Sequence, residues 1–319
     1  MTSEISLSAL VPLEYGGSRL DQVAADLFPE YSRSRIQSWI KSGELRVNGE
    51  ARKQTSRLSG GETIQVGAAN EAAGEWLPEP IDLDVVYEDE ALLVVNKSAG
   101  LVVHPAAGNW SGTLLNGLLN LHNNLINIPR AGIVHRLDKD TSGLMVVAKT
   151  LQSQNHLVQQ LQSRSVKRAY RAITVDGPDA AGRVNEAIGR HPVVRTRMAV
   201  LKQGGKEAIT HFEVLEKCGQ YRDILVNLET GRTHQIRVHM AWLGFPLVGD
   251  PVYGKKLDSK KLAETKKQAF QILEGFPRQA LHAQTLSLVH PVTGETMTWQ
   301  SDLPEDYQTL WQAIQALAQ

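Results

Sequence analysis

Apolar positions near the start of the chain recur with a helical period and predict two short helices. The first helix is expected to bury positions spaced i, i+3, i+4 and i+7, namely Leu20, Val23, Ala24 and Leu27. The second is expected to begin after Ser32, to end at Gly43, and to bury Ile36, Trp39 and Ile40. Residues 45–47 then alternate as a strand, and Asn48-Gly49 predicts a tight hairpin turn. The pattern therefore indicates a helix–helix–hairpin unit.

An acidic, proline-containing stretch at residues 68–80 predicts a linker. We therefore expect a small first domain over residues 16–75 and a larger second domain over residues 76–319. The second domain alternates strand-like and helical patterns, which favours an α+β fold around a largely antiparallel mixed β-sheet with flanking helices. Residues 144–148 form a continuous apolar run, as expected of a strand buried on both faces.

The composition excludes several classes of protein. The 319 residues include 34 Lys and Arg, 34 Asp and Glu, and one cysteine, Cys218. A zero net charge excludes a uniformly basic coat, and one cysteine excludes an intrachain disulfide or a cysteine-based zinc ribbon. Without an apolar stretch of the ~20 residues that span a bilayer, we expect no membrane association and a cytoplasmic location. No oligomer signal is present, so a monomer is expected.

The charges are segregated along the chain. Residues 16–60 carry a net +3 and residues 160–210 a net +6, whereas residues 71–90 hold eight acidic residues and no Lys or Arg. Such segregation favours a polyanionic partner, although charges that only solubilise a surface account for it equally well.

A polar loop within residues 132–149 (GIVHRLDKDTSGLMVVAK) holds the candidate chemistry. Two strand-like arms, Ile133-Val134 and residues 144–148, are expected to flank Asp138 and Asp140. Asp140 fits plain turn chemistry, and both carboxylates fit a magnesium site. Asp138 also fits a nucleophile or general base at a sugar, or a structural partner of Arg136 or another cation. The residues alone leave these four interpretations open.

The first domain resembles an S4 domain, a small module of ribosomal proteins and RNA-modifying enzymes. The resemblance lies in residues 18–49, SRLDQVAADLFPEYSRSRIQSWIKSGELRVNG. It implies a basic face that binds structured RNA and that includes Arg19, Arg33 and Arg35.

The second domain resembles the RluA-type pseudouridine synthases in four ordered blocks. These are HRLDKDTSGLMVVAKT at residues 135–150, VKRAYRA at 166–172, GRTHQIRVHMAWLGFPLVGDPVYG at 231–254 and QALHAQTLSLVHPVTG at 279–294. The resemblance implies an isomerase in which Asp138 is catalytic and Tyr170 stacks on the uracil. It also favours Arg232 as the cation that holds Asp138 ionised. Because the isomerisation changes no electron balance, no cofactor and no metal are expected.

The resemblance further implies 23S rRNA, or a precursor of the large ribosomal subunit, as the partner, and excludes DNA. The expected substrate is the helix 69 stem-loop, at uridines 1911, 1915 and 1917, with a role in subunit assembly as an addition. Arg136 is expected to fill the space left by the flipped nucleotide. The residues expected to track phosphates are Arg164, Lys167, Arg190, Arg195 and Arg197. Two rival functions stay open: an RNA-binding assembly protein with a vestigial site, and a metal-dependent phosphoryl or glycosyl transferase.

Overall fold

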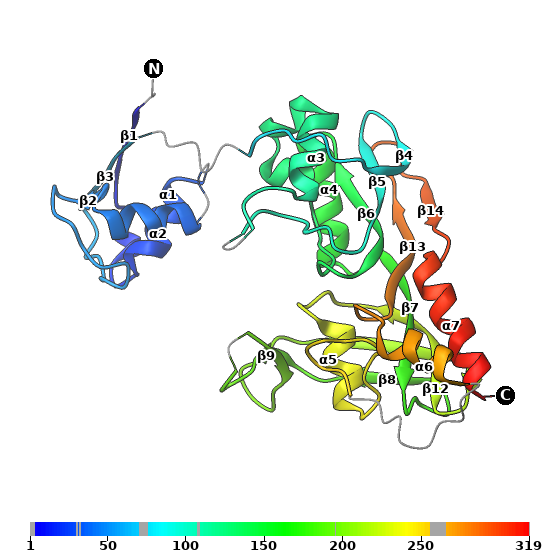
Figure 1. Ribbon diagram of the computed structural model, residues 1–319. Helices are drawn as coiled ribbons and strands as arrows, with labels where there is room; N and C mark the ends of the chain where they lie inside the picture. The colour runs from blue at the N-terminus through cyan, green and yellow to red at the C-terminus, as the bar shows by residue number, and fades with distance from the viewer. Residues whose placement is uncertain are drawn as a thin grey trace. The chain divides into compact units, whose positions relative to one another are not determined.

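The chain folds into two units, Met1–Trp76 and Leu77–Gln319, which are shown as a ribbon in Figure 1. This computed structural model describes residues 4–29, 31, 33–69, 76–106, 109–194, 196–255 and 266–318. Each unit has its own hydrophobic core and is considered by itself.

The first unit packs two helices on a three-stranded antiparallel sheet. The helices are α1 (Leu20–Leu27) and α2 (Arg33–Ser42), and the sheet runs in the order β1 (Glu4–Leu10), β3 (Thr63–Ala69), β2 (Leu45–Val47). The predicted apolar faces of both helices are confirmed, because Leu20, Val23, Ile36 and Trp39 are buried in one core. Strand β1 was not predicted, and Ser32 lies outside the described residues.

The predicted turn at Asn48-Gly49 is confirmed, but the hairpin is wider than the sequence indicates. Both residues have left-handed backbones, with φ of 51° and 81°, as a type I′ turn requires. The turn is closed by a single bridge between Val47 and Glu50. The strand that pairs with β2 is β3, which follows a further loop.

The second unit is built on a nine-stranded sheet that is antiparallel except where β6 meets β13. The order is β4-β5-β6-β13-β7-β12-β11-β8, and β14 pairs with β13. The strands are β4 (Asp84–Glu88), β5 (Leu92–Lys97), β6 (Ser142–Ala148), β7 (Lys167–Val175), β8 (Gly182–Asn185), β11 (Ile209–Cys218), β12 (Tyr221–Leu228), β13 (Leu281–Val289) and β14 (Thr296–Gln300). The expected α+β fold with a largely antiparallel mixed sheet is confirmed.

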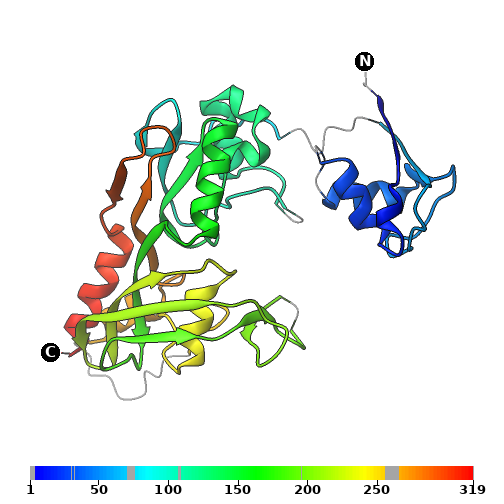
Figure 2. The same ribbon diagram turned by 180° about the vertical axis from the view of Figure 1, so that it is seen from behind.

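Helices cover the two ends of this sheet, as the opposite views of Figures 1 and 2 show. The helices are α3 (Leu114–Leu121), α4 (Leu151–Gln162), α5 (Gln235–Trp242), α6 (Lys267–Glu274) and α7 (Glu305–Ala318). Within the described residues, 3-10 turns lie at η1 (Leu13–Tyr15) in the first unit and at η2 (Asn123–Asn127) and η3 (Pro129–Gly132) in the second. A separate two-stranded hairpin, β9 (Ile188–Arg190) and β10 (Met198–Val200), projects beside α5 in Figure 2. No helix within the described ranges is long and apolar enough to cross a membrane.

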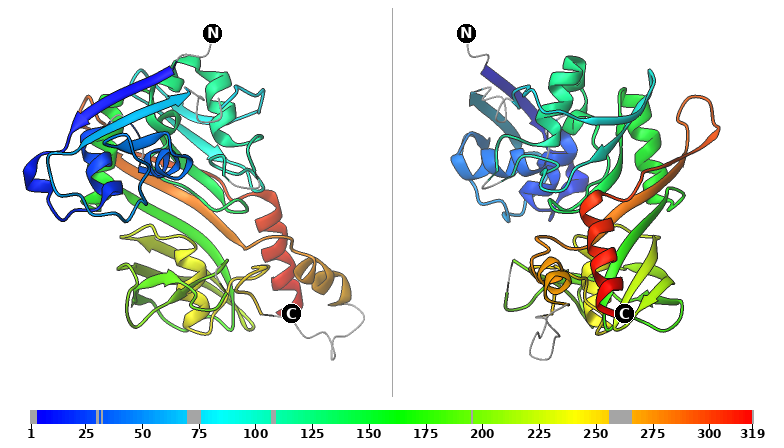
Figure 3. Two further views of the ribbon diagram at one scale, coloured as in Figure 1. Left: turned by 90° about the vertical axis from the view of Figure 1, so that its left-hand side faces the viewer. Right: turned by 45° about the vertical axis from the view of Figure 1, so that its right-hand side comes forward.

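The C-terminal helix α7 packs along α6 and against β11, as both views of Figure 3 show. Its apolar side, which includes Tyr307, Leu310 and Ile314, is buried with Phe270 and Leu273 of α6. Burial of a large apolar side chain contributes about 1.5–3 kcal/mol, so α7 is an integral part of the core.

Strand β6 fixes the candidate loop at the centre of the sheet. All seven of its residues are buried, which confirms the apolar run as a strand that packs on both faces. It pairs along its length with β5, whereas Ser142 and Gly143 pair in parallel with β13. The expected arm at Ile133-Val134 is not a strand, because Ile133 makes only one bridge, to Val147. The loop is therefore anchored mainly from its C-terminal side.

Candidate active site

Asp138 lies in the loop between η3 and β6, with its side chain 18% exposed. Nη1 of Arg237 donates to its Oδ2 at 2.9 Å, and Nε2 of His234 lies 3.9 Å from its Oδ1. A main-chain bond from the N–H of Thr141 to the carbonyl of Asp138, 3.1 Å long, closes the turn. One carboxylate oxygen is thus held by a guanidinium, while the other faces an imidazole and solvent.

Arg237 is buried to 5% exposure and binds two carboxylates at once. Its Nε and Nη2 donate to Oδ2 and Oδ1 of Asp250 at 2.7 and 2.9 Å, which is the bidentate geometry of a strong ion pair. Its guanidinium carbon also lies 5.2 Å from the ring centroid of Tyr253. Burial alone would raise the pKa of Asp250, but the hydrogen bonds and charge of Arg237 hold that pKa below its ordinary value. Asp250 therefore anchors Arg237 as a fixed cation.

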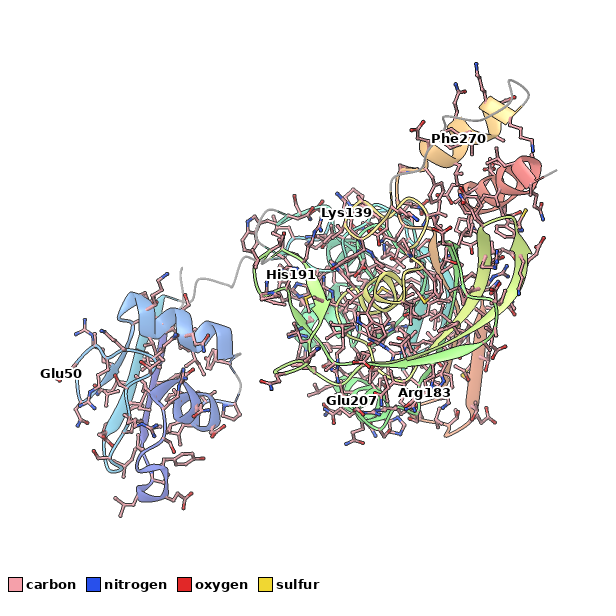
Figure 4. The ribbon with its side chains drawn as sticks, turned by 90° about the horizontal axis from the view of Figure 1, so that it is seen from below. Glu50, Lys139, Arg183, His191, Glu207 and Phe270 are labelled. Carbon is pink, nitrogen blue, oxygen red and sulfur yellow. The ribbon has the colours of Figure 1, made fainter. Side chains whose placement is uncertain are left out.

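The prediction that Arg232 holds Asp138 is wrong. Nε of Arg232 donates to the carbonyl of Glu207 at 2.8 Å, and Figure 4 shows the labelled Glu207 well apart from Lys139, the neighbour of Asp138. Arg232 lies before α5, which begins at Gln235 after a left-handed His234. Arg237, on its first turn, faces the loop. Arg237 lies in the same GRTHQIR block, and its position inside an otherwise buried helix was the signal for an internal ion pair.

Tyr170 lies in β7, between Val226 of β12 and Ala283 of β13, and its residue is 5% exposed. Burial raises the pKa of its phenol, and the Asp138 charge raises it further, against an opposing effect of Arg168. The phenol is therefore neutral, and it lies within electrostatic reach of Asp138 on the most central part of the sheet.

Two buried cations that the sequence analysis missed hold the main chain of the loop. Nζ of Lys97, at the end of β5, donates to the carbonyls of Ser98, Leu101 and Lys139 at 2.8, 3.0 and 2.9 Å. Burial lowers the pKa of Lys97 to about 7, against the opposing charges of Asp140 and Asp138. The only sequence signal was a lysine at the end of an apolar strand.

Arg278 approaches the loop from the other side. Its guanidinium pairs with Asp306 at 2.6 and 2.8 Å, and its Nη1 lies 3.4 Å from the carbonyl of Asp140. The next residue, Gln279, donates to Oγ1 of Thr141 at 2.9 Å. The chain just before β13 and the first turn of α7 thus brace residues 140 and 141, so the position of Asp138 is set by elements from three parts of the sequence.

The predicted RNA-binding residues are mostly dispersed over exposed positions. Arg136, Lys167 and Arg197 are exposed, Arg190 ends β9, and Arg164 pairs with Glu207 and Glu229. In the first unit Arg19 pairs with Asp21 at 2.9 Å. Arg33 and Arg35 lie on α2, but their side chains, like Arg195, are outside the described residues.

The interpretation of Asp138 and Asp140 as a metal site can be examined by counting ligands. Among the residues that the structure describes, no three His, Cys, Asp or Glu side chains come together, whereas the interpretation as a magnesium site asks for only two carboxylates. Oδ2 of Asp138 is instead engaged by Arg237. The geometry matches the interpretation of Asp138 as the partner of a cation, with one oxygen left for chemistry.

Comparisons with known proteins agree with this arrangement. Residues 91–242 match the family model described as RNA pseudouridylate synthase, and residues 18–64 match the S4 domain. A protein of Pseudomonas aeruginosa named ribosomal large subunit pseudouridine synthase D is 53% identical over 98% of this chain and 96% of its own. A protein of the same name from Escherichia coli O157:H7 is 47% identical over 99% and 96%. The solved structure of human RNA Pseudouridylate Synthase Domain Containing 4 is 25% identical, with a TM-score of 0.56 over 72% of this chain and 92% of its own.

Proposed function

Because the chain belongs to the RNA pseudouridylate synthase family and carries an S4 domain, we propose that it isomerises uridine in ribosomal large-subunit RNA, with Asp138 as the catalytic residue. The observation that carries this proposal is the position of the carboxylate: Oδ2 is paired with the buried Arg237, and Oδ1 is directed away from that pair. A fixed guanidinium that donates to one carboxylate oxygen holds the orientation of the carboxylate.

The reaction breaks the N1–C1′ bond of uridine and joins C1′ to C5 of the same uracil. The proton on C5 leaves and N1 gains one, so atoms and electrons balance without a co-reactant. The ionised oxygen of Asp138 acts at the ribose–base junction of the bound nucleotide. Tyr170 supplies a neutral aromatic face for the uracil, and such stacking contributes about 1–3 kcal/mol per base.

The substrate follows from the relatives and from the chemistry of the target. The relatives are named for the large ribosomal subunit, and we place the activity at uridines 1911, 1915 and 1917 of the helix 69 stem-loop of 23S rRNA. A base within a stack must be flipped out before its C1′ is accessible, and loops make this less costly. Arg136, exposed two positions before Asp138, fills the vacated space.

The test of Asp138 is its replacement by asparagine, which keeps the shape and removes the charge. Release of tritium from RNA labelled at uracil C5 reports the isomerisation, because the C5 proton must leave. We expect D138N to lower the single-turnover rate on the order of a thousandfold, with RNA affinity within about twofold of the parent. Equal rates in the two proteins would exclude Asp138 as the catalytic residue.

The S4 unit is proposed to add affinity through the basic start of α2. Arg33→Glu with Arg35→Glu should weaken binding of large-subunit RNA and reduce the slope of log affinity against log salt by about 0.7 for each lost phosphate contact. Lys217→Glu, at an exposed lysine on β11 of the other unit, is the matched control. An unchanged slope in the double variant would show that this face does not bind RNA.

An additional role in subunit assembly has a separate signature. A strain that lacks the protein would accumulate incomplete large subunits, and D138N would restore the subunit profile without restoring pseudouridine. Failure of D138N to restore a profile that the parent protein restores would assign the whole effect to catalysis.

A further inference from the structure

His234 occupies a strained position between the candidate catalytic carboxylate and Tyr253. It precedes α5 with a left-handed backbone, φ 57° and ψ 22°, a conformation that costs a non-glycine residue on the order of 1 kcal/mol or more. Its side chain is 22% exposed, and its ring meets that of Tyr253 edge-on at 5.7 Å. Strain of this kind persists only where surrounding contacts hold the residue in place.

The hydrogen bonds of Tyr253 bear on which nitrogen of the His234 imidazole carries the hydrogen. The N–H of Met198 donates to the Tyr253 hydroxyl at 2.9 Å, and an amide nitrogen can only donate. The single proton of the hydroxyl is therefore free for the other contact, the 2.9 Å bond to Nδ1 of His234. We assign that proton to the bond with Nδ1, so that Nδ1 accepts and a neutral imidazole carries its proton on Nε2, the nitrogen that faces Asp138.

Burial keeps the imidazole of His234 neutral. Burial lowers the pKa of His234, and the charges of Arg237 and Arg136 lower it further. The carboxylates of Asp138 and Asp250 act in the opposite direction without reversing the shift. Protonation would place a hydrogen on Nδ1, which could then no longer accept from the Tyr253 hydroxyl.

We propose that His234 is a positioning residue, which orients Oδ1 of Asp138 through an uncharged Nε2–H whose tautomer is set by the Tyr253 hydroxyl. The two atoms lie 3.9 Å apart, and a closure of about 1 Å brings them to hydrogen-bond distance when substrate binds. A neutral N–H orients the carboxylate without forming a second ion pair, as a charged imidazolium would. The negative charge on Oδ1 is therefore not neutralised and can act at the ribose–base junction. This inference rests on the proposed role of Asp138.

The experiment is a double-mutant cycle measured by single-turnover tritium release from C5-labelled 23S rRNA. In His234→Gln the side-chain amide offers an N–H near the place of Nε2 but has no tautomer to set. In Tyr253→Phe the ring over Arg237 is kept and only the hydroxyl is removed. His234→Ala removes the donor, and His156→Gln on α4 is the matched control for the histidine replacement.

We expect His234→Ala to lower the rate roughly 10- to 100-fold while the Kd for RNA changes less than about twofold. His234→Gln should recover most of that loss. Tyr253→Phe should lower the rate about tenfold in the parent protein and less than about twofold in the His234→Gln background, because only an imidazole needs its tautomer set.

Each contrary outcome overturns a defined part of the proposal. Equal losses from Tyr253→Phe in both backgrounds would show that the hydroxyl acts through folding or through Met198 alone. A His234→Ala rate equal to that of the parent would exclude the imidazole. A parent protein that releases no tritium, with D138N equally silent, would refute the proposed function and with it the role of His234, whereas the two outcomes above refute the role of His234 alone in an active protein.

Discussion

The double ion pair of Arg237 makes a strong prediction about stability and activity together. Arg237→Met keeps the length of the side chain but removes the only guanidinium that the described residues place on Asp250, whose side chain is fully buried. Removal of one partner from a buried ion pair costs about 3–5 kcal/mol, because the other charge stays buried. We expect a loss of this size in the free energy of unfolding, together with loss of isomerisation.

A second variant separates the two effects. In Arg237→Met with Asp250→Asn the buried charge is gone, while the Asn carbonyl can still accept the main-chain N–H groups of Val252 and Tyr253, which Asp250 accepts at 2.8 and 3.0 Å. The double variant should therefore regain at least half of the lost stability. It should stay inactive, because no cation then holds Asp138.

Urea denaturation and single-turnover assays of the same preparations measure both quantities. An unchanged m value confirms that the midpoint reports stability. Arg237→Met within about 1 kcal/mol of the parent would refute the buried-charge argument. A double variant as active as the parent would show that Asp138 works without its guanidinium.

Two further predictions concern the pairing of β6 with β13, where Nδ1 of His282 lies 2.9 Å from Oγ of Ser142 and Gly143 pairs with Ala283. Burial lowers the pKa of His282 from 6.5 to about 4. Between these two pH values only the unfolded chain binds a proton at this residue. The contribution of neutral His282 to the free energy of unfolding is therefore fully present above pH 6.5 and falls by about 3 kcal/mol as the pH drops to 4. His282→Gln should flatten that part of the urea-midpoint profile, and a parallel profile in the variant would contradict the assignment. A Cβ on Gly143, whose φ is 117°, would lie 2.2 Å from the carbonyl oxygen of Ala283. Gly143→Ala should therefore abolish activity and lower the melting temperature. An unchanged melting temperature would show that the two strands separate at no measurable cost.

The sequence predicted those elements whose apolar spacing alone determines their burial. Both helices of the first unit and strand β6 follow this rule, because each has a single packed face or is apolar throughout. Strand β1 was missed although Ile5, Leu7 and Ala9 alternate with serines and pack against the core, which is the period-2 pattern of a half-buried strand.

The sequence motifs predicted which residues lie in the candidate site but not which cations contact them. Asp138 and Tyr170 were selected by their blocks, and the structure brings their elements to the centre of one sheet. The cation was misassigned because α5 is buried on nearly every side, so a spacing argument could not choose which of its polar residues faces inward. Lys97 and Arg278 donate to main-chain carbonyls of the loop. Every residue has such a carbonyl, so the sequence does not show which one a buried cation will bind.

The bracing of the loop from late in the chain has a consequence for the protein during its own synthesis. Arg278 and Gln279 contact partners 138 positions earlier, and Arg278 in turn depends on Asp306. A growing polypeptide that already contains its S4 unit therefore still lacks the bracing of residues 140 and 141 until Asp306 has been translated. Chains that stop before Arg278 would keep the residues of the first unit but lack the contacts that hold the loop after Asp138.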